Sequence, residues 1–274
     1  MPSPVRTRST TALIATLAIS MAAPAAAQER SAEDWVRRCR DYGDDDRARH
    51  CEVRDVRLSR VDGRLTVDGR TNGGVWIRGW DRSEVLVRAK IQTWAETDAE
   101  ARRLASAIRI RTDGGRIEAE ESDMGRRSGW SVSYDVYVPR RTDLDVRTHN
   151  GGISVEGVQG RIDVEALNGG VSLRDVQGEV RGGTTNGGVT LALDGDRWVG
   201  QGVDLETTNG GVTIVVPERY SARLETATVN GGMNVDFPIT VQGMVGRRLS
   251  TTLGSGGSLI RVRTTNGGVT LRRR

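Results

Sequence analysis

Short alternating stretches of apolar and small polar residues recur through the second half of the chain, each directly after an Asn-Gly-Gly triplet. Alternation of apolar and polar residues with a period of two indicates a strand that has one buried face and one exposed face. The apolar positions are Ile153/Val155, Val171/Leu173, Val189/Leu191, Val212/Ile214, Met233/Val235 and Val269/Leu271. The polar positions between them are Ser154, Ser172, Thr190, Thr213, Asn234 and Thr270. A second apolar-alternating stretch precedes most triplets, as at Ile162/Val164, so one repeat contains at least two short strands.

The Asn-Gly-Gly triplet is the repeating unit. Seven of the eight asparagines begin such a triplet: Asn72, Asn150, Asn168, Asn186, Asn209, Asn230 and Asn266. The heptapeptide TTNGGVT occurs unchanged at 184–190, 207–213 and 264–270. Asn tolerates the left-handed backbone conformation and Gly adopts positive φ freely, which predicts a structural corner at each triplet. Asp113-Gly114-Gly115 and Gly254-Ser255-Gly256-Gly257 resemble degenerate copies.

Two all-β architectures fit these repeats. From Asn150 the triplets are spaced by 18, 18, 23, 21 and 36 residues, and a period near 20 is typical of solenoids, in which each repeat buries its apolar face against its neighbours. We therefore expect a right-handed parallel β-helix, or β-solenoid, with NGG corner turns and short N-terminal capping helices. The alternative is an antiparallel meander joined by Asn-Gly hairpins.

The front half is less regular. Ser31–Tyr42 and Glu96–Ile108 are predicted to be helices, the second starting with a Thr97-x-x-Glu100 capping box, and both are expected to cover an exposed sheet edge. The apolar stretches 84–94 and 130–139 are expected to form wider N-terminal rungs. The predicted organisation is a signal peptide at 1–27, an N-terminal cap at 28–60, and a solenoid at 61–274 with a helical insert near 96–108.

The N-terminus predicts export. Arg6 and Arg8 precede a short apolar stretch, Thr11–Ala23, and Ala25-Ala26-Ala27 then supplies a cleavage signal. In an exported chain, the two cysteines, Cys39 and Cys51, are expected to form a disulfide. The alternative is a metal site using His50, which lacks the ligand spacing of zinc sites. No later apolar run is long enough to span a membrane, so no integral membrane segment is expected in the mature chain.

The charge pattern argues against nucleic acid as a partner. The formal net charge is +4, and arginines and acids interleave along the chain, whereas a nucleic-acid surface concentrates basic and aromatic residues. No catalytic, cofactor-binding or metal site is predicted, because the acids share no register in the repeats and the two histidines lie outside any nucleophile motif. Thr190, Thr213, Thr270 and Trp76 are the candidate surface contacts.

The GxVxVxxxNGGVxL repeats, the signal peptide and the helix that interrupts the early strands together resemble the putative-adhesin family of bacterial envelope proteins. The resemblance covers roughly Val53 to Leu271. It implies a β-solenoid fold and an envelope location, in a group largely of unknown function.

We therefore expect an exported, non-enzymatic protein, periplasmic or extracellular, that presents a repetitive β surface for adhesion or scaffolding. Its expected partner is an unidentified protein or glycan at the cell envelope. Two alternatives remain: a polysaccharide-active β-helix enzyme, and an accessory protein of envelope-stress signalling.

Overall fold

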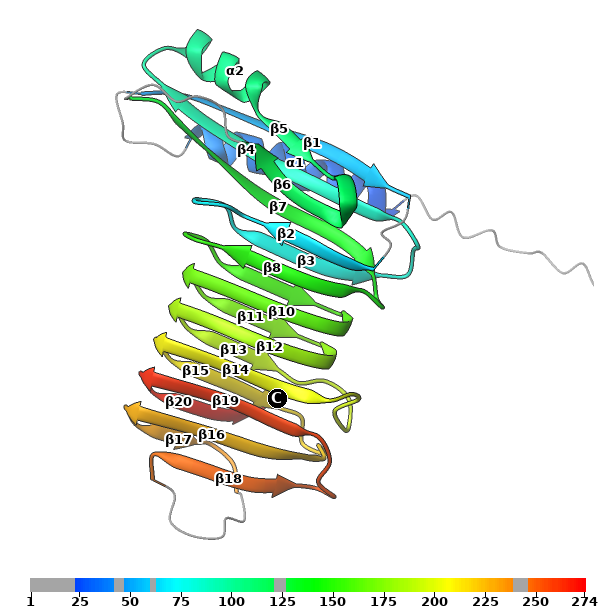
Figure 1. Cartoon of the computed structure of the whole chain (residues 1–274), viewed down its shortest axis with the longest axis vertical. Helices are drawn as coiled ribbons and strands as arrows, with labels where there is room; N and C mark the ends of the chain where they lie inside the picture. The colour runs from blue at the N-terminus through cyan, green and yellow to red at the C-terminus, as the bar shows by residue number, and fades with distance from the viewer. Residues whose placement is uncertain (1–22, 42–46, 60–62, 121–126, 239–245) are drawn as a thin grey trace, which may run out of the picture.

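The computed structural model describes residues 23–41, 47–59, 63–120, 127–238 and 246–274 (Figure 1). Within these residues the chain forms two ten-stranded sheets, with two α-helices at the N-terminal end, which confirms the all-β expectation. The predicted signal peptide falls mainly on residues 1–22, which lie outside the described residues.

The first sheet, sheet A, has the strand order β1-β4-β7-β3-β9-β11-β13-β15-β20-β17. Its strands are β1 Ala48–Leu58, β3 Val75–Trp80, β4 Val85–Ala95, β7 Gly129–Pro139, β9 Ile153–Glu156, β11 Val171–Arg174, β13 Val189–Ala192, β15 Val212–Val216, β17 Met233–Val235 and β20 Val269–Arg273. The second sheet, sheet B, has the order β18-β16-β19-β14-β12-β10-β8-β2-β6-β5. Its strands are β2 Arg64–Asp68, β5 Arg109–Arg111, β6 Arg116–Glu120, β8 Asp143–Thr148, β10 Gln159–Asn168, β12 Gln177–Asn186, β14 Gly202–Asn209, β16 Ala222–Asn230, β18 Arg248–Leu253 and β19 Leu259–Asn266.

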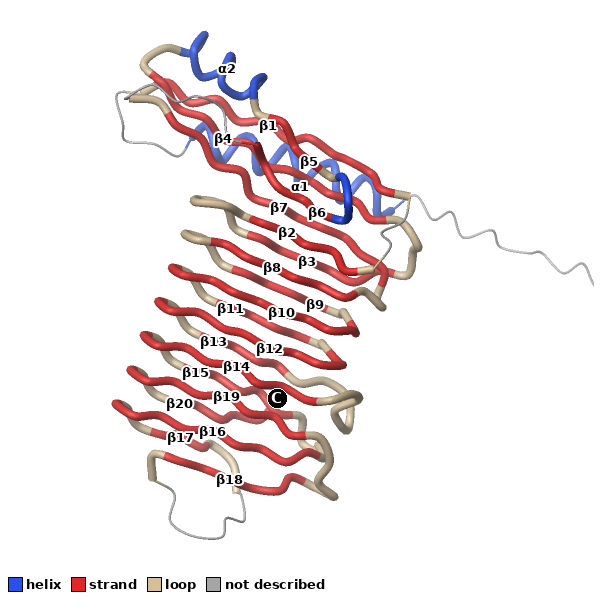
Figure 2. Tube along the Cα trace, in the orientation of Figure 1, coloured by secondary structure: helices blue, strands red, loops and turns tan. Residues whose placement is uncertain are grey.

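Each repeat forms one rung that crosses from sheet B to sheet A at its NGG corner, as Figure 2 shows for the stacked loops. Equivalent strands of successive repeats pair in parallel, with Asn168 opposite Asn186 in sheet B and Ser172 opposite Thr190 in sheet A. The apolar positions point between the sheets and are buried, except Met233 and Val235 of the last rung, which are partly buried. Every rung thus buries its apolar side chains against the rungs on either side.

Both sheets are mixed, because antiparallel pairs adjoin the parallel repeats at the two ends. The stretches expected as wide N-terminal rungs are β4 and β7, which pair antiparallel with one another. The strand β7 also pairs in parallel with β3 and follows β6 of sheet B, as a strand of a rung does. The strand β4 has antiparallel partners on both sides, so the expectation does not hold for it. At the far end, β16 pairs antiparallel with β18.

The NGG corners were expected to need a left-handed backbone at the asparagine. The structure shows instead that the first glycine of the corner is required because successive corners stack closely. No corner asparagine has positive φ; the non-glycine residues with positive φ in the described chain are Arg70 and Asp175. A Cβ on Gly187 would lie 2.2 Å from the carbonyl oxygen of Gly169, the equivalent glycine of the preceding rung. Successive corners are therefore in backbone contact, and a side chain at the first glycine has no room.

The asparagine side chains form a continuous hydrogen-bonded ladder along the corners. In spatial order the ladder runs Asn72, Asn150, Asn168, Asn186, Asn209, Asn266 and Asn230, with each amide nitrogen donating to the carbonyl of the preceding asparagine over 2.8–3.1 Å. A buried threonine two residues before the asparagine adds a second contact in most rungs. Thr184, for example, donates its hydroxyl to the Gly169 carbonyl oxygen over 2.7 Å.

The two degenerate triplets are not corners. Asp113–Gly115 forms the short 3-10 helix η1, which joins the antiparallel pair β5 and β6, and both of its glycines have positive φ. Gly254–Gly257 joins β18 to β19, and three of its glycines also have positive φ. These segments reverse or redirect the chain, so they need positive φ, whereas among the glycines of the NGG corners Gly267 alone has it, at 158°.

The predicted helices are α1 Ala23–Asp41 and α2 Asp98–Ala107, both of which contact β1 at the edge of sheet A. The predicted Cys39–Cys51 disulfide is present and ties α1 to β1. Thr97 caps α2 by accepting a hydrogen bond from the Glu100 amide. Arg54 of β1 donates to the carbonyls of Ala105 and Ile108 at the other end of the helix, where the helix dipole favours a cation.

Candidate functional site

The outer face of sheet A carries a row of hydroxyl side chains in a single register. Trp76 pairs with Ser154, and the row continues through neighbouring strands as Ser154, Ser172, Thr190, Thr213 and Thr270, which we call the hydroxyl row. Asn234 follows Thr270 at the far end. All four predicted surface contacts thus lie on one line. Neighbouring members are separated by one strand spacing, about 4.8 Å.

Part of this face is uncharged. A second outward row runs beside the hydroxyl row and contains Ala192 and Val215 next to Thr190 and Thr213. All four side chains are partly exposed. These four residues, the uncharged patch, lie on the seventh and eighth of the ten strands, and Arg174 and Arg272 flank the patch directly in the second row. An uncharged core bordered by charged or polar residues is typical of protein contact sites.

Trp76 lies at the N-terminal end of the row, but its ring is already engaged. The guanidinium of Arg78 lies 4.3 Å from the centroid of the ring, and the ring packs edge-on against Tyr137 with centroids 5.8 Å apart. Trp80 also contacts Tyr137 and is covered by Arg82. One face of each indole is therefore occupied by an arginine. Trp76 borders the hydroxyl row as a packed, partly exposed residue, and a sugar could stack on that covered face only by displacing Arg78.

The outer face of sheet B is charged. Arginines and acids alternate in its rows and form ion pairs: Arg147 lies 3.0 Å from Asp145 and 4.0 Å from Glu165, and Arg261 lies 3.0 Å from Glu225 and 3.4 Å from Asp204. Many of these pairs join neighbouring rungs. Exposed pairs of this kind each contribute little to stability, so their main consequence is a solvated, internally neutralised surface.

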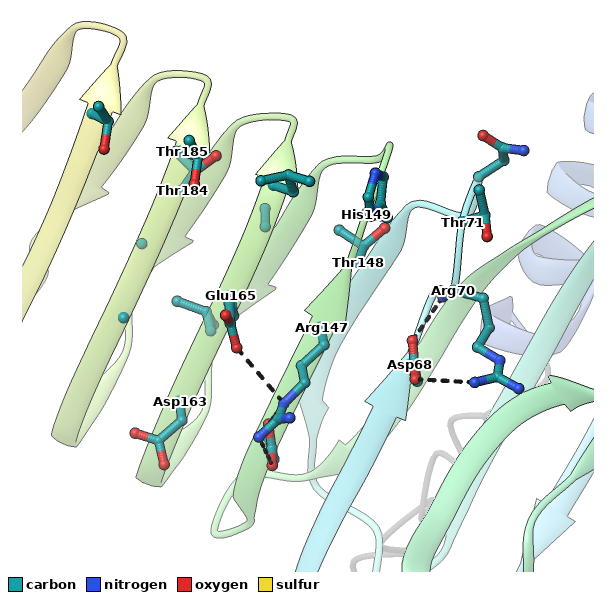
Figure 3. A pocket seen from close by; sticks show the side chains of 18 of the residues that line it. Asp68, Arg70, Thr71, Arg147, Thr148, His149, Asp163, Glu165, Thr184 and Thr185 are labelled. Carbon is teal, nitrogen blue, oxygen red and sulfur yellow. Dashed lines mark hydrogen bonds and ion pairs between the residues drawn. The ribbon is translucent and has the colours of Figure 1, made fainter. Parts of the chain in front are cut away.

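A depression of about 1090 Å³ opens on this charged face near the N-terminal strands (Figure 3). Asp68, Arg147, Asp163 and Glu165 lie along it, and Gly182 and Gly183 of β12 line it with backbone alone. Arg147 reaches toward Glu165, and Arg70 reaches toward Asp68 (Figure 3). His149, an exposed corner residue, lies at its rim.

The carboxylates of this depression do not form a free acid pair. Asp145 and Asp163 occupy adjacent register positions, but Asp145 is bound by Arg147, and Asp163 is bound by Arg64. A glycosidase needs one carboxyl group that retains its proton and a second that stays ionised. Each of these two carboxylates is instead occupied in an ion pair with an arginine. The arrangement therefore suits a solvated ionic surface better than acid–base catalysis.

In the described part of the chain, no group of three or more His, Cys, Asp or Glu side chains converges on a point that could hold a metal ion. Over the same residues, no helix is long and apolar enough to cross a bilayer.

Asp175 is the one carboxyl group in the described repeats whose pKa is raised. It lies at the turn opposite the NGG corner and has a left-handed backbone, with φ at 48°. The equivalent residue of the preceding rung is Gly157, which has φ at 66°. Partial burial raises the pKa of Asp175, the negative charge of Asp194 adds to this effect, and Arg140 opposes it. The turn therefore holds a carboxylate in a place where its ionised form is disfavoured.

Replacing Asp175 with asparagine should stabilise the protein at neutral pH. Because the pKa of Asp175 in the folded state is above the ordinary 3.8, folding favours the protonated acid. The ionised carboxylate therefore lowers the free energy of unfolding. This loss is absent below the ordinary pKa and complete above the raised pKa. Asn also tolerates the left-handed backbone. We expect a gain below about 1 kcal/mol, because the group is exposed, measured as urea unfolding midpoints at pH 7 and pH 3.

Asp196→Asn is the matched control, because Arg197 hydrogen-bonds that carboxylate and lowers its pKa. The control should lose stability at pH 7 and lose nothing in strong acid. Stabilisation by both substitutions would show that general charge reduction, rather than the position of Asp175, is responsible.

The sequence predicted the hydroxyl row but not the structural threonines. Thr184, Thr207 and Thr264, the first residues of the three TTNGGVT copies, are buried and hydrogen-bond the corner of the adjacent rung. Their recurrence two residues before the asparagine was the available signal. The same heptapeptide thus carries one threonine that stabilises the corner and one that faces solvent on sheet A.

Comparison with known proteins gives one family and several matching solved structures. A family described as Toastrack DUF4097 matches residues 45–272. No curated protein matches the chain.

Three solved structures are similar. A putative cell adhesion protein from Clostridium sporogenes has a TM-score of 0.45 and 10% identity over 82% of this chain and 100% of its own. A putative adhesin from Bacteroides fragilis has a TM-score of 0.28 and 10% identity over 81% and 97%. A putative lipid binding protein from Parabacteroides distasonis has a TM-score of 0.31 and 9% identity over 82% and 96%.

Proposed function

The chain belongs to the Toastrack DUF4097 family, and from that premise we propose that it is an exported, non-enzymatic envelope protein whose outer sheet A face contacts a partner. The repeats are proposed to form a right-handed solenoid, which in-register parallel pairing of successive rungs supports. Adhesion or scaffolding through a repetitive surface is the function that suits such a rod. The partner is a protein or glycan of the cell envelope.

The contrast between the two faces carries this proposal. Sheet B presents neutralised ion pairs, which a partner would have to desolvate at a cost. Sheet A instead presents Thr190, Thr213, Ala192 and Val215 as a patch without a charge. This flat array of hydroxyl and methyl groups can hydrogen-bond and pack against a partner at a low desolvation cost, and its hydroxyl row continues into the neighbouring rungs.

Export is supported by the basic and apolar pattern of the N-terminus and by the disulfide, which is stable in oxidising compartments. The absence of enzymatic activity is supported by the guanidinium groups that neutralise the carboxylates on sheet B. Release of reducing sugar from any envelope polysaccharide by the purified protein would contradict this second part.

Substituting arginine at both Thr190 and Thr213 should abolish partner binding. Two charges introduced at the centre of the uncharged patch would be buried in the contact without partners. We expect at least a tenfold loss of affinity, about 1.4 kcal/mol. Binding of the chain lacking residues 1–27 would be measured on isolated cell envelopes, on peptidoglycan sacculi and on immobilised surface polysaccharides.

The matched control is the double variant Thr185→Arg and Thr208→Arg. These threonines come from the same two heptapeptides but are exposed at the corners, outside the sheet A face. The control should bind as the unmodified protein does, and both double variants should keep its circular dichroism spectrum. Equal loss in both variants, or no binding of the unmodified protein to any of the three materials, would contradict the proposal.

A further inference from the structure

The spatial order of the rungs differs from their order in the chain. The rung made by β19 and β20 lies between the rung of β14 and β15 and the rung of β16 and β17, in both sheets. In Figure 1 the red strand β19 accordingly lies between the yellow strand β14 and the orange strand β16. The chain therefore builds β14 to β17 with a space one rung wide between them, and a later segment fills it.

The inserted rung is held from both sides by the repeat contacts. On one side, Asn266 donates to Asn209 over 2.8 Å and Thr264 donates to the Gly210 carbonyl oxygen over 2.7 Å. On the other side, Asn230 donates to Asn266 over 2.9 Å and Thr228 donates to the Gly267 carbonyl oxygen over 2.7 Å. The interactions that place this rung in the slot are all made with neighbouring rungs, so they do not depend on which copy of the chain supplies it.

Neighbouring rungs around the slot are nearly identical in sequence. The three TTNGGVT copies lie side by side, because Asn186 pairs with Asn209 and Asn209 pairs with Asn266. The wall formed by β14 and β15 thus accepts a TTNGGVT rung on each side. Any chain that presents this rung in the same direction can satisfy the same hydrogen bonds.

The segment that precedes the inserted rung has the composition of a hinge. Gly254, Ser255, Gly256, Gly257 and Ser258 connect β18 to β19, and Gly/Ser segments behave as flexible chains. Its hydrogen bonds to the rest of the protein are made at the surface of the turn, where the Ser258 hydroxyl donates to the Gly200 carbonyl oxygen over 2.7 Å, the Arg223 guanidinium donates to the Gly257 carbonyl oxygen over 3.1 Å, and Ser255 bonds the Ser221 hydroxyl. Opening the segment must break these bonds, but it breaks none of those between rungs. The segment passes from one side of β16 to the other, since Leu253 pairs with Ala222 and Leu259 pairs with Arg223.

We propose that two copies of this chain exchange the rung of β19 and β20, so that each fills the slot of the other. The exchange opens each chain at 254–258 and conserves every contact between rungs. Such swapping is a low-cost route to a dimer, because monomer and dimer differ mainly at the hinge and in concentration. The partner is thus a second copy of this chain, independently of what the sheet A face binds.

Cysteine pairing between separately labelled copies tests the exchange. Thr213 and Thr270 are register partners on adjacent parallel strands, which are close enough for a disulfide. Thr213→Cys in one copy and Thr270→Cys in another would be unfolded together without reductant, refolded at high concentration and oxidised. The expected result is a covalent dimer of the two variants on a non-reducing gel, and less of it when refolding is dilute.

Two controls make the result decisive. Thr190→Cys mixed with Thr270→Cys should give no such dimer, because β15 lies between them and two strand spacings exceed the reach of a disulfide. Both cysteines, Thr213→Cys and Thr270→Cys, in one chain should cross-link within the monomer under dilute conditions, which shows that the pair can oxidise. If that chain cross-links but the mixture yields no dimer above the Thr190→Cys control, the proposal is wrong.

Shortening the hinge gives a second, independent readout. Removal of residues 255–257 leaves about 10 Å of extended chain between Leu253 and Leu259, which barely spans two strands and cannot pass around β16. Closure within one chain is then prevented, whereas reaching into a second copy is not. The shortened protein should be dimeric by light scattering; a folded monomer would overturn the proposal.

Discussion

Replacing Gly210 with alanine is expected to destabilise the protein by about 3 kcal/mol or more, an effect at the upper end for overpacking. The new Cβ would lie 1.9 Å from the carbonyl oxygen of Gly187 in the preceding rung. No flexible side chain can move aside, because the atom it meets is backbone. Accommodation would require two rungs to separate, which would break the hydrogen bonds between Asn186 and Asn209 and between Thr207 and the Gly187 carbonyl oxygen. Urea unfolding with the disulfide intact measures the change.

Gly211, the next residue, is the matched control. A Cβ at Gly211 would lie 3.5 Å from the Gly268 carbonyl oxygen, an ordinary contact distance, and its backbone has no positive φ. Gly211→Ala should therefore change the free energy of unfolding by less than about 1 kcal/mol. Similar losses for the two variants would show that backbone conformation, rather than the stacking distance, selects glycine at the corner.

Removing residues 259–274 is expected to disorder β16, β17 and β18 as well as the deleted strands. Among the described strands, β16 pairs with β18 and β19, and β17 pairs with β20. The deletion therefore separates this three-strand unit from the rest of both sheets, and isolated units of this size are marginally stable. Amide hydrogen exchange within 222–253 should rise to nearly the unprotected rate, while β8 to β13 keep their protection.

A full-length variant distinguishes the effect of displacing the β19–β20 rung from the effect of shortening the chain. Gly267→Ala would place a Cβ 2.2 Å from the Gly210 carbonyl oxygen, which displaces the inserted rung without shortening the protein. It should raise exchange over the same residues, though less than the deletion does. Slow exchange in 222–253 in both proteins would contradict the role of β19 and β20 as the connection to the rest of the fold.

The local features of this fold were predictable because they depend on short-range chemistry. Alternation of apolar and polar residues predicted the strands after each triplet, the capping box predicted α2, and the two cysteines predicted the bond between α1 and β1. The alignment of Trp76, Thr190, Thr213 and Thr270 also followed, since each lies at the same position after its triplet.

The reason for the glycines and the order of the rungs were not predictable. Asn-Gly commonly marks left-handed turns, so the sequence alone favoured that explanation, and only the distance between Gly187 and Gly169 shows that stacking is the cause. The three TTNGGVT copies are equivalent in register, so nothing local specifies which are neighbours. The 36-residue gap between Asn230 and Asn266 was the single indication that the chain leaves the stack before returning.

The order of the rungs also affects how the protein is made. Synthesis from the N-terminus delivers β14 to β18 before β19 and β20. During that interval the β14–β15 rung and the β16–β17 rung each present unpaired backbone groups to the slot, and such edges recruit other strands. Slow delivery would lengthen this interval and fast delivery would shorten it. The rate at which the chain is synthesised, and not only the concentration of protein, should therefore influence which copy fills the slot.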